Sequence, residues 1–401
     1  MNTLRFITAG NVDDGKSTLI GRLLYDSDSI HTDQLGVLQK QTKQEGVDID
    51  LSLITDGLRA EREQGITIDV AYKYFSTSKR KFIIADAPGH EQYTRNMITG
   101  ASNSDLIIVL VDARNGITDQ TKRHASVGSL MGIKKAIIAI NKIDLLNYSE
   151  EVFNQIKNDF EAIKSELNYN EIIYIPVSAL VGDNVVTTSE NTPWYNGKSI
   201  LQTLESVELD GTEDLEARFQ VQWVIRPKDE DNHDYRGYAG QILSGSYKVG
   251  DKVTILPAKI ETTLVKIEKD LKEVSEVVAG DNVVLHFEND IDISRGDTVV
   301  LSHQLPKEDN QINTWISWLD NNSLQVGKTY LLQHRFKNVR VKVQQINRKW
   351  NVNQWQFTDG DAVQLNDIAQ VTLKTSQPLY YDTFEKNPKS GSAILIDETS
   401  F

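Results

Sequence analysis

Gly10-Asn-Val-Asp-Asp-Gly15-Lys16-Ser17 is the stretch that decides the expected fold. It fits G-x-x-x-x-G-K-[S/T], the phosphate-binding loop of nucleoside triphosphatases. Its glycines let the backbone curl, so that successive N–H groups point at one phosphate chain. A strand-like apolar run, 4–9, precedes the loop, and a helical run, 18–24, follows it. The motif requires this strand–loop–helix order, because the helix N-terminus adds its dipole to the anion site.

Two side chains of the loop have distinct expected roles. Lys16 is expected to reach the β- and γ-phosphates, and Ser17 to offer its hydroxyl to Mg²⁺. The alternative interpretation is a glycine-rich turn with an unrelated lysine, which the strand–loop–helix context disfavours. The residues expected to line the phosphates are Asn11, Val12, Asp13, Asp14, Gly15, Lys16, Ser17 and Thr18.

Apolar runs alternate with stretches of helical length up to about residue 205. The apolar runs are 81–86, 106–112, 135–141 and 172–177, and helical stretches include 121–131 and 151–167. Strands that are buried on both faces of a parallel sheet have this composition. We therefore predict a three-layer α/β domain over residues 1–207, with binding residues just past the carboxyl ends of its strands.

The pattern changes after residue 207. An acidic, glycine-containing stretch, 208–216, is expected to be a linker. Short alternating segments with Gly-Asp turns at 250–251, 280–281 and 296–297 then predict a small β-barrel over 217–302. A charged, proline-containing stretch, 304–310, is expected to separate a third domain, 308–401, whose residues also alternate.

Asp86-Ala-Pro-Gly89 follows the run 81–86. A carboxylate at that strand end can hold Mg²⁺, and the Gly89 amide can contact a γ-phosphate, so the loop senses whether that phosphate is present. Asp-x-x-Gly alone is a common turn, and its place after a phosphate loop decides the interpretation. Between the two motifs, Thr67 of Gly65-Ile-Thr67 is the candidate second hydroxyl ligand of Mg²⁺; the alternative is an ordinary strand start.

Asn141-Lys142-Ile143-Asp144 indicates which base is bound. Guanine presents two donors, N1–H and N2–H₂, and the Asp144 carboxylate can accept both, whereas adenine offers a mismatched edge. Lys142 would lie over the base plane, and Asn141 would tie the loops together. After the next strand, the Ala179 amide of Ser178-Ala179-Leu180 can donate to guanine O6. The pair of motifs predicts GTP as the nucleotide.

Composition limits the other function classes. The formal net charge is −14, which weakens a nucleic-acid role, because a protein that grips phosphates usually carries a basic face. There is no cysteine, so cysteine chemistry is excluded. No apolar run reaches the roughly 18 residues of a membrane span, and no signal precedes the first strand. We expect a cytoplasmic protein that binds neither membrane nor nucleic acid.

Together these residues resemble the translation-factor class of GTPases, which includes elongation factors Tu and 1-alpha. The shared marks are Val12-Asp13, Gly65-Ile-Thr67, Asp86-Ala-Pro-Gly-His90 and the barrel segment 236–251. The resemblance implies a P-loop GTPase domain with a mostly parallel sheet and helices on both faces, followed by two small β-barrel domains. It also implies that His90 is catalytic and orients the attacking water, flanked by Val12 and Ile66.

Within this class, the chain is similar to the large, GTP-hydrolysing subunit of bacterial sulfate adenylyltransferase. Stretches 12–26, 56–72, 82–97 and 112–124 carry the similarity, and Asp14 stands where elongation factors have histidine. The resemblance implies GTP hydrolysis coupled to the synthesis of adenosine 5′-phosphosulfate and pyrophosphate from ATP and sulfate. A separate small catalytic subunit performs that synthesis, so a hetero-oligomer is expected. Segments 45–75 and 86–100 are expected to rearrange with the γ-phosphate.

Two rival functions stay open at this point. One is a translation factor that delivers aminoacyl-tRNA, against which the acidic balance and Asp14 argue. The other is a non-catalytic, GTP-dependent scaffold. A fused adenylylsulfate kinase is not expected, because the chain has no second phosphate loop. His124 is either a plain helix-face residue or a partner contact.

Overall fold

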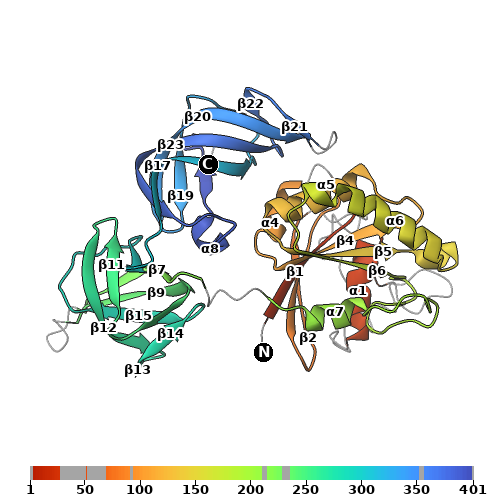
Figure 1. The fold of residues 1–401 in the computed structure, drawn as a ribbon, viewed down its shortest axis with the longest axis horizontal. Helices are drawn as coiled ribbons and strands as arrows, with labels where there is room; N and C mark the ends of the chain where they lie inside the picture. The colour runs from red at the N-terminus through yellow and green to blue at the C-terminus, as the bar shows by residue number, and fades with distance from the viewer. Residues whose placement is uncertain are drawn as a thin grey trace. The chain divides into compact units, whose positions relative to one another are not determined.

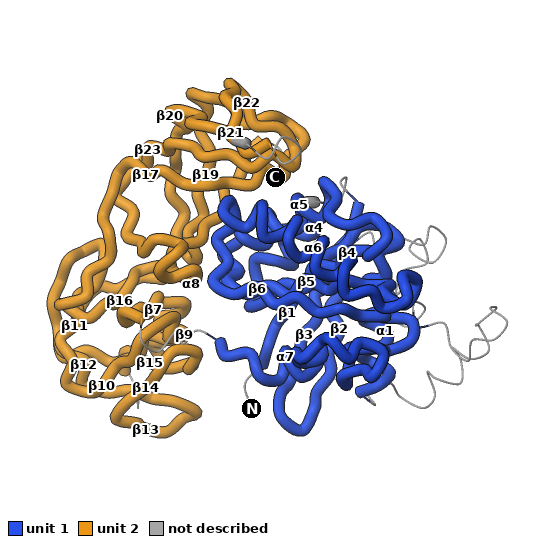
Figure 2. Tube along the Cα trace, turned by 45° about the vertical axis from the view of Figure 1, so that its right-hand side comes forward, with its two compact units in different colours: residues 1–209, 352–356 blue, residues 210–351, 357–401 orange. Residues whose placement is uncertain are grey.

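A computed structural model describes residues 3–27, 51, 69–90, 94–209, 215–227, 235–351 and 356–399. The chain divides into two compact units, which Figure 2 colours separately. The first unit comprises residues 1–209 and 352–356, and the second comprises residues 210–351 and 357–401.

A six-stranded sheet forms the centre of the first unit, in the order β2-β3-β1-β4-β5-β6. The edge strand β2 runs antiparallel to β3, and the other neighbouring pairs are parallel. The strands are β1 (Thr3–Ala9), β2 (Ala71–Ser76), β3 (Lys81–Asp86), β4 (Leu106–Asp112), β5 (Lys135–Asn141) and β6 (Glu171–Pro176).

Helices cover both faces of this sheet. Figure 1 shows α1 and α7 on one face and α4, α5 and α6 on the other. The described helices are α1 (Lys16–Asp26), α4 (Thr94–Ala101), α5 (Asp119–Leu130), α6 (Glu150–Ile163) and α7 (Ile200–Ser206), with short 3-10 turns η3 (Ile143–Leu146) and η4 (Lys164–Glu166).

Local sequence explains why these elements form. Every residue of β4 is buried, as expected for a strand covered on both faces. On α6, Phe153, Ile156 and Phe160 recur at helical spacing and form its buried side. Ser149 and Ser199 begin α6 and α7 by accepting backbone N–H groups of the first turn.

The predicted fold class is confirmed: an α/β domain with a mostly parallel sheet is followed by β domains. The runs 81–86, 106–112 and 135–141 coincide with β3, β4 and β5. The run 172–177 is β6, which begins and ends one residue earlier, and the stretch 121–131 is α5, which begins two residues earlier.

In the second unit, an eight-stranded antiparallel sheet closes on itself, because β11 pairs with both β16 and β12. Its own apolar core includes Phe219, Tyr247 and Leu285. Its strands are β7 (Arg218–Gln220), β8 (Trp223–Ile225), β9 (Gly237–Ser244), β11 (Lys252–Leu256), β12 (Ile260–Lys269), β13 (Lys272–Val274), β15 (Asn282–Phe287) and β16 (Thr298–Leu301); β10 (Ser246–Lys248) pairs with β14 (Glu276–Val278).

The three Gly-Asp turns of this sheet share one geometry. Gly250, Gly280 and Gly296 have φ of 97°, 95° and 94°, a left-handed conformation that favours glycine. The aspartate after each glycine accepts the N–H of the residue three positions before it, at 2.7, 3.2 and 2.8 Å. The dipeptide therefore closes each turn with both its backbone and its side chain.

A six-stranded antiparallel sheet follows, in the order β17-β23-β20-β19-β24, with β21 beside β20. Its first strand begins at Lys307, so part of the stretch expected to separate the domains is itself a strand. The elements are β17 (Lys307–Ser317), β19 (Thr329–His334), β20 (Lys337–Asn351), β21 (Gln356–Thr358), β23 (Ile368–Tyr381) and β24 (Ile394–Ile396), with the pair β18 (Leu324–Gln325) and β22 (Ala362–Val363) and the short helix α8 (Pro388–Gly391).

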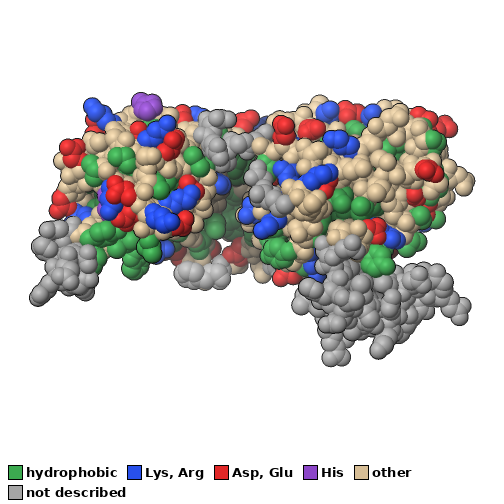
Figure 3. Space-filling view, turned by 90° about the horizontal axis from the view of Figure 1, so that it is seen from below, with side chains coloured by type: hydrophobic (Ala, Val, Ile, Leu, Met, Phe, Trp, Pro, Cys, Tyr) green, Lys and Arg blue, Asp and Glu red, His purple; other side chains and the backbone are tan. Residues whose placement is uncertain are grey.

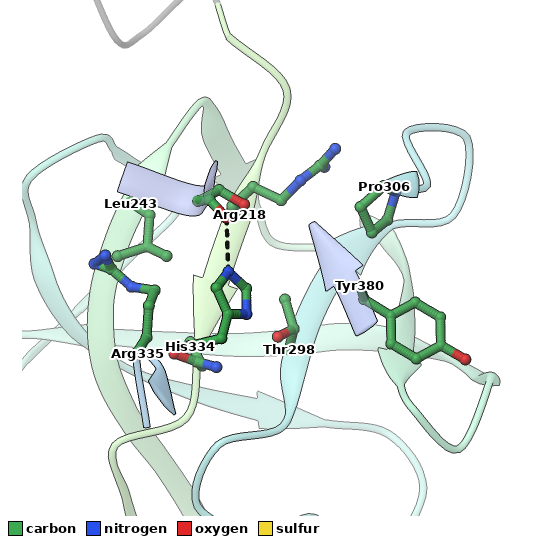
Figure 4. A pocket seen from close by; sticks show the side chains of 9 residues that line it. Arg218, Leu243, Thr298, Pro306, His334, Arg335 and Tyr380 are labelled. Carbon is green, nitrogen blue, oxygen red and sulfur yellow. Dashed lines mark hydrogen bonds between the residues drawn. The ribbon is translucent and has the colours of Figure 1, made fainter. Parts of the chain in front are cut away.

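A pocket inside the second unit is lined by residues of both sheets (Figure 4). Arg218, Leu243 and Thr298 come from the closed sheet, and His334 and Tyr380 from the other. The His334 ring nitrogen Nε2 lies 2.7 Å from the Ser390 carbonyl oxygen, and burial lowers the pKa of this histidine. The nucleotide motifs all belong to the first unit, so this pocket is not part of the candidate site.

Charged side chains of both signs lie interspersed on the face shown in Figure 3. Among the helices of the described residues, none has the length and apolar character needed to cross a bilayer.

Candidate nucleotide-binding site

The phosphate loop connects β1 to α1 and is closed by its own side chains. Asn11 N–H donates to Asp14 Oδ2 at 2.8 Å, and Asp14 N–H donates to the Asn11 carbonyl at 3.2 Å. Asp13 and Gly15 have left-handed φ values of 68° and 93°. A Cβ at Gly15 would lie 2.4 Å from Asn141 Nδ2, so glycine is required there for space as well as for conformation. The loop thus curls tightly into the first turn of α1, as an anion site needs.

Lys16, at the end of this loop, forms a buried ion pair with Asp86. Their side chains are only 7% and 2% exposed. Asp86 ends β3, which lies next to β1 with Thr8 opposite Asp86. A buried charge is costly unless it has a partner, so each charge here stabilises the other. Ser17 is partly buried in the first turn of α1.

The Asp86–Gly89 loop packs directly on the phosphate loop. A Cβ at Gly89 would lie 2.2 Å from the Gly10 carbonyl oxygen, so only glycine fits. Gln120 Nε2 of α5 donates to the Gly89 carbonyl at 3.1 Å. His90, the next residue, is exposed. The structure therefore brings the expected catalytic histidine to the rim of the phosphate loop, while Thr67 and Ile66 lie outside the described residues.

His124 lies in the interior beside this loop and differs from His90. Its pKa is lowered to about 4, mainly by burial and also by the positive charges of Arg123 and Lys16, so the ring is neutral at neutral pH. It is 3% exposed. Of the two roles left open for His124, a buried helix-face position is the one that the structure has.

Asn141 joins the phosphate loop to the Ser178–Leu180 loop. It ends β5, is 2% exposed, and donates through Nδ2 to the Asp14 carbonyl at 2.7 Å. Its Oδ1 accepts the Ala179 N–H at 2.9 Å. Guanine O6 was expected to accept that same hydrogen, so the base would have to share it with Asn141.

Lys142 reaches from the base-reading loop to the phosphate loop. Its ammonium contacts the Asp13 carbonyl and lies 3.0 Å from Asp112 Oδ2. Asp112 also pairs with Arg114 at 2.6 Å. Burial alone would raise the pKa of Asp112, but the hydrogen bonds from Arg114 and Lys142 hold it at about 2. The lysine expected over the base plane is thus held by a permanently ionised carboxylate.

Two residues that were not expected belong to this site. Asp112 ends β4, at the same sheet edge as the motifs, and that position is the signal that could have identified it. Arg22 of α1 donates through Nε to the Ala179 carbonyl at 3.3 Å and through Nη2 to the Leu180 carbonyl. Nothing in the local sequence around Arg22 distinguishes it from an ordinary helix-surface arginine.

The contacts connect every described motif into one edge of the sheet. They join the phosphate loop to Asp86 and Gly89 on one side, and to Asn141, Lys142 and Ala179 on the other. Strands β1, β3, β5 and β6 supply these loops from their carboxyl ends. The loop that is expected to bind phosphates therefore lies beside the loops that are expected to read the base.

Comparison with known protein families shows which class of protein the chain belongs to. Residues 1–217 match the family model described as the elongation factor Tu GTP binding domain, and residues 311–401 match the one described as GTP-eEF1A C-terminal domain-like. A solved structure of Sup35 complexed with GMPPNP covers 99% of this chain and 91% of its own, at 21% identity and a TM-score of 0.44. By its family models, the chain is a GTPase of the translation-factor class, as its motifs indicated.

Relatives that match nearly the whole of this chain narrow the class of protein to one family. Sulfate adenylyltransferase subunit 1 of Teredinibacter turnerae is 48% identical over 398 residues, which cover 98% of this chain and 84% of that protein. The bifunctional enzyme CysN/CysC of Mycobacterium tuberculosis is 46% identical over 398 residues, and this chain spans 65% of its length. The chain belongs to the sulfate adenylyltransferase subunit 1 family, which confirms the resemblance seen in the sequence.

Proposed function

We propose that this chain binds GTP with Mg²⁺ at the carboxyl edge of its sheet, hydrolyses GTP, and couples the hydrolysis to sulfate activation. A small catalytic partner subunit would form adenosine 5′-phosphosulfate and pyrophosphate from ATP and sulfate. The observation that carries the proposal is the 48% identity to sulfate adenylyltransferase subunit 1 over 98% of the chain. Delivery of aminoacyl-tRNA, the alternative, is not favoured, because the full-length relatives carry the sulfate adenylyltransferase name.

At the phosphate end of the proposed site, a bound nucleotide would change the partners of two charged side chains. Lys16 is proposed to bind the β- and γ-phosphates, and Asp86 to hold Mg²⁺ through water, yet here they pair with each other. A triphosphate with its metal offers each charge an opposite one, so binding would exchange one ion pair for two. The amides of the phosphate loop and Gly89 would receive the phosphate oxygens.

The donor set fits Mg²⁺, a hard cation that prefers oxygen ligands and usually keeps substrate phosphates among them. The Ser17 hydroxyl begins α1 and the Asp86 carboxylate ends the neighbouring strand. Thr67 is proposed as the second hydroxyl ligand. When bound, the metal neutralises charge on the β- and γ-oxygens. His90 is proposed to orient the attacking water through its position at the rim of the phosphate loop.

The base end of the proposed site would select guanine. Asp144, at the start of η3, would accept both N1–H and N2–H₂, and Lys142 would cover the base plane. Ser178, Ala179 and Leu180 would line the O6 side. The partner subunit must bind the GTP state and the GDP state differently, since otherwise hydrolysis could not bias it. GTP and ATP are cytoplasmic metabolites, so the proposal implies a cytoplasmic hetero-oligomer.

Reconstitution tests the proposal. The chain is combined with the small catalytic subunit of a sulfate adenylyltransferase, and adenosine 5′-phosphosulfate formation is measured with and without GTP. GTP should raise product formation, and His90→Ala should abolish that increase while GTP still binds. The exposed His303, outside the first unit, provides the control His303→Ala, which should behave as wild type. Full stimulation by His90→Ala would remove the catalytic role of His90, and tight GTP-dependent binding of aminoacyl-tRNA would contradict the proposed function.

A further inference from the structure

A polar segment follows the Ser178–Leu180 loop and is fixed to the end of β6. Residues 183–194 form turns, and their Asn184 and Thr192 side chains are only 0% and 1% exposed. Asn184 Nδ2 donates to the Pro176 carbonyl at 2.8 Å and to Thr192 Oγ1 at 2.9 Å, and its Oδ1 accepts Ser189 N–H at 2.8 Å. These buried hydrogen bonds give the segment one defined position.

Asp183 of this segment bonds to both base-reading loops. Its backbone carbonyl accepts Ser178 N–H at 3.2 Å, which ties it to the start of the Ser178–Leu180 loop. Its Oδ2 accepts the Tyr148 hydroxyl at 2.7 Å, and its Oδ1 accepts Ser189 Oγ at 2.5 Å and Asn191 Nδ2 at 3.1 Å. The carboxylate thus has three side-chain donors, and one of them belongs to the other loop.

Tyr148 closes the loop that carries Asp144. Asn147 and Tyr148 have left-handed φ values of 51° and 55°, and Tyr148 N–H donates to the Ile143 carbonyl at 2.9 Å. Non-glycine residues keep such a conformation only where their surroundings hold it. Trp194 Nε1 donates to the Tyr148 carbonyl at 3.0 Å, so the same polar segment holds the backbone as well as the hydroxyl.

The Tyr148 hydroxyl keeps its proton and therefore remains a hydrogen-bond donor to Asp183. Its pKa is raised to about 12, first by burial and then by the hydrogen bond to Asp183 and the charges of Asp183 and Asp144. The hydroxyl is therefore protonated throughout the physiological range.

We propose that Tyr148 and Asp183 form a clamp that sets the distance between the Asp144 loop and the Ser178–Leu180 loop and so positions them for guanine. The inference rests on the proposed GTP site. A carboxylate that accepts two donors from one base edge tolerates little displacement, while the O6 edge is read from the other loop. Neither clamp residue has to touch the base, so both are positioning residues.

Tyr148→Phe tests the clamp, because it removes one hydroxyl and keeps the ring. The affinities for GDP and for inosine diphosphate, which lacks the 2-amino group, are measured on the full chain by calorimetry. A correctly placed Asp144 makes two contacts with guanine and one with hypoxanthine. The variant should weaken GDP binding roughly tenfold, as expected for loss of a charge-assisted hydrogen bond, and inosine diphosphate binding less, so the ratio of affinities falls.

The chain offers a matched control for the clamp. Tyr174 also donates its hydroxyl to a carboxylate, Glu161 at 2.8 Å, and Tyr174→Phe should leave the ratio unchanged. Asp183→Asn keeps an acceptor and should lose less than Asp183→Ala. A ratio of affinities that stays unchanged in Tyr148→Phe, whether both nucleotides lose affinity equally or neither does, would overturn the clamp. Wild-type chain that binds no guanine nucleotide would instead overturn the proposed function beneath it.

Discussion

At the scale of single residues, Asp14 is unusual because it puts a buried carboxylate inside a loop that is expected to receive phosphates. Its side chain is 6% exposed. Its pKa is raised to about 6, chiefly by burial and also by the charges of Asp112 and Asp13, while the Asn11 N–H and the Lys142 charge lower it. A carboxyl with a raised pKa favours the native state when protonated, so its contribution to stability is present below about pH 4 and lost as the pH rises through about 6.

Asp14→Asn should therefore stabilise the chain above pH 6. The amide keeps an acceptor for Asn11 N–H and removes the buried charge. The gain in the free energy of unfolding should grow between pH 4 and pH 6 and level off above, at no more than about 3 kcal/mol, since one pKa unit corresponds to about 1.4 kcal/mol. Urea titrations across this range measure it, with Asp159→Asn, which removes an exposed carboxylate of α6, as the control. A gain that does not depend on pH would rule out this explanation.

Asp144→Asn should change which base the chain prefers. The carboxylate accepts two donors from guanine, whereas an amide offers one acceptor and one donor, which suit xanthine and its C2 carbonyl. GTP affinity should fall at least roughly tenfold and affinity for xanthosine triphosphate should rise. Competition binding measures both affinities. Asp159→Asn on the exposed side of α6 is the control, and unchanged preference for GTP in Asp144→Asn would exclude Asp144 as the base reader.

At the scale of helices and strands, the elements that could be predicted from the sequence are the buried ones. The runs that coincide with β3, β4 and β5 are almost wholly apolar because both faces are covered, so their ends are sharp in sequence. The edge strand β2 was not predicted. Its Tyr72 and Tyr74 are 42% and 69% exposed, and the strand has no continuous apolar run.

In the candidate site, too, some residues could be predicted from the sequence and others could not. Its motif residues are identified because each motif is a short segment of chain with its own chemistry. Arg22, Asp112 and the clamp pair act through contacts between distant segments, such as the 35 positions from Tyr148 to Asp183. Such a contact forms only when the sheet brings the strand ends together, so no local sequence pattern predicts it.

At the scale of the whole molecule, one arginine joins the two sheets of the second unit. Arg218 of β7 is 1% exposed and donates to both oxygens of Asp382, which follows β23, at 2.9 and 2.8 Å. It also donates to Glu216 at 2.6 Å and to the carbonyls of Ala217 and Gln304 at 2.9 and 2.7 Å. All five guanidinium hydrogens are thus used, an arrangement that lysine cannot reproduce.

Arg218→Met should destabilise the second unit by roughly 3–5 kcal/mol, because it leaves Asp382 buried without its partner. Adding Asp382→Leu removes the orphaned charge, so the double variant should recover most of the loss. Urea titration of the full chain measures both, and Arg348→Met, an exposed arginine of the same unit, controls for loss of a surface charge. A double variant no more stable than Arg218→Met would show that the cost comes from lost packing, and the ion pair would then not be what holds these two sheets as one body.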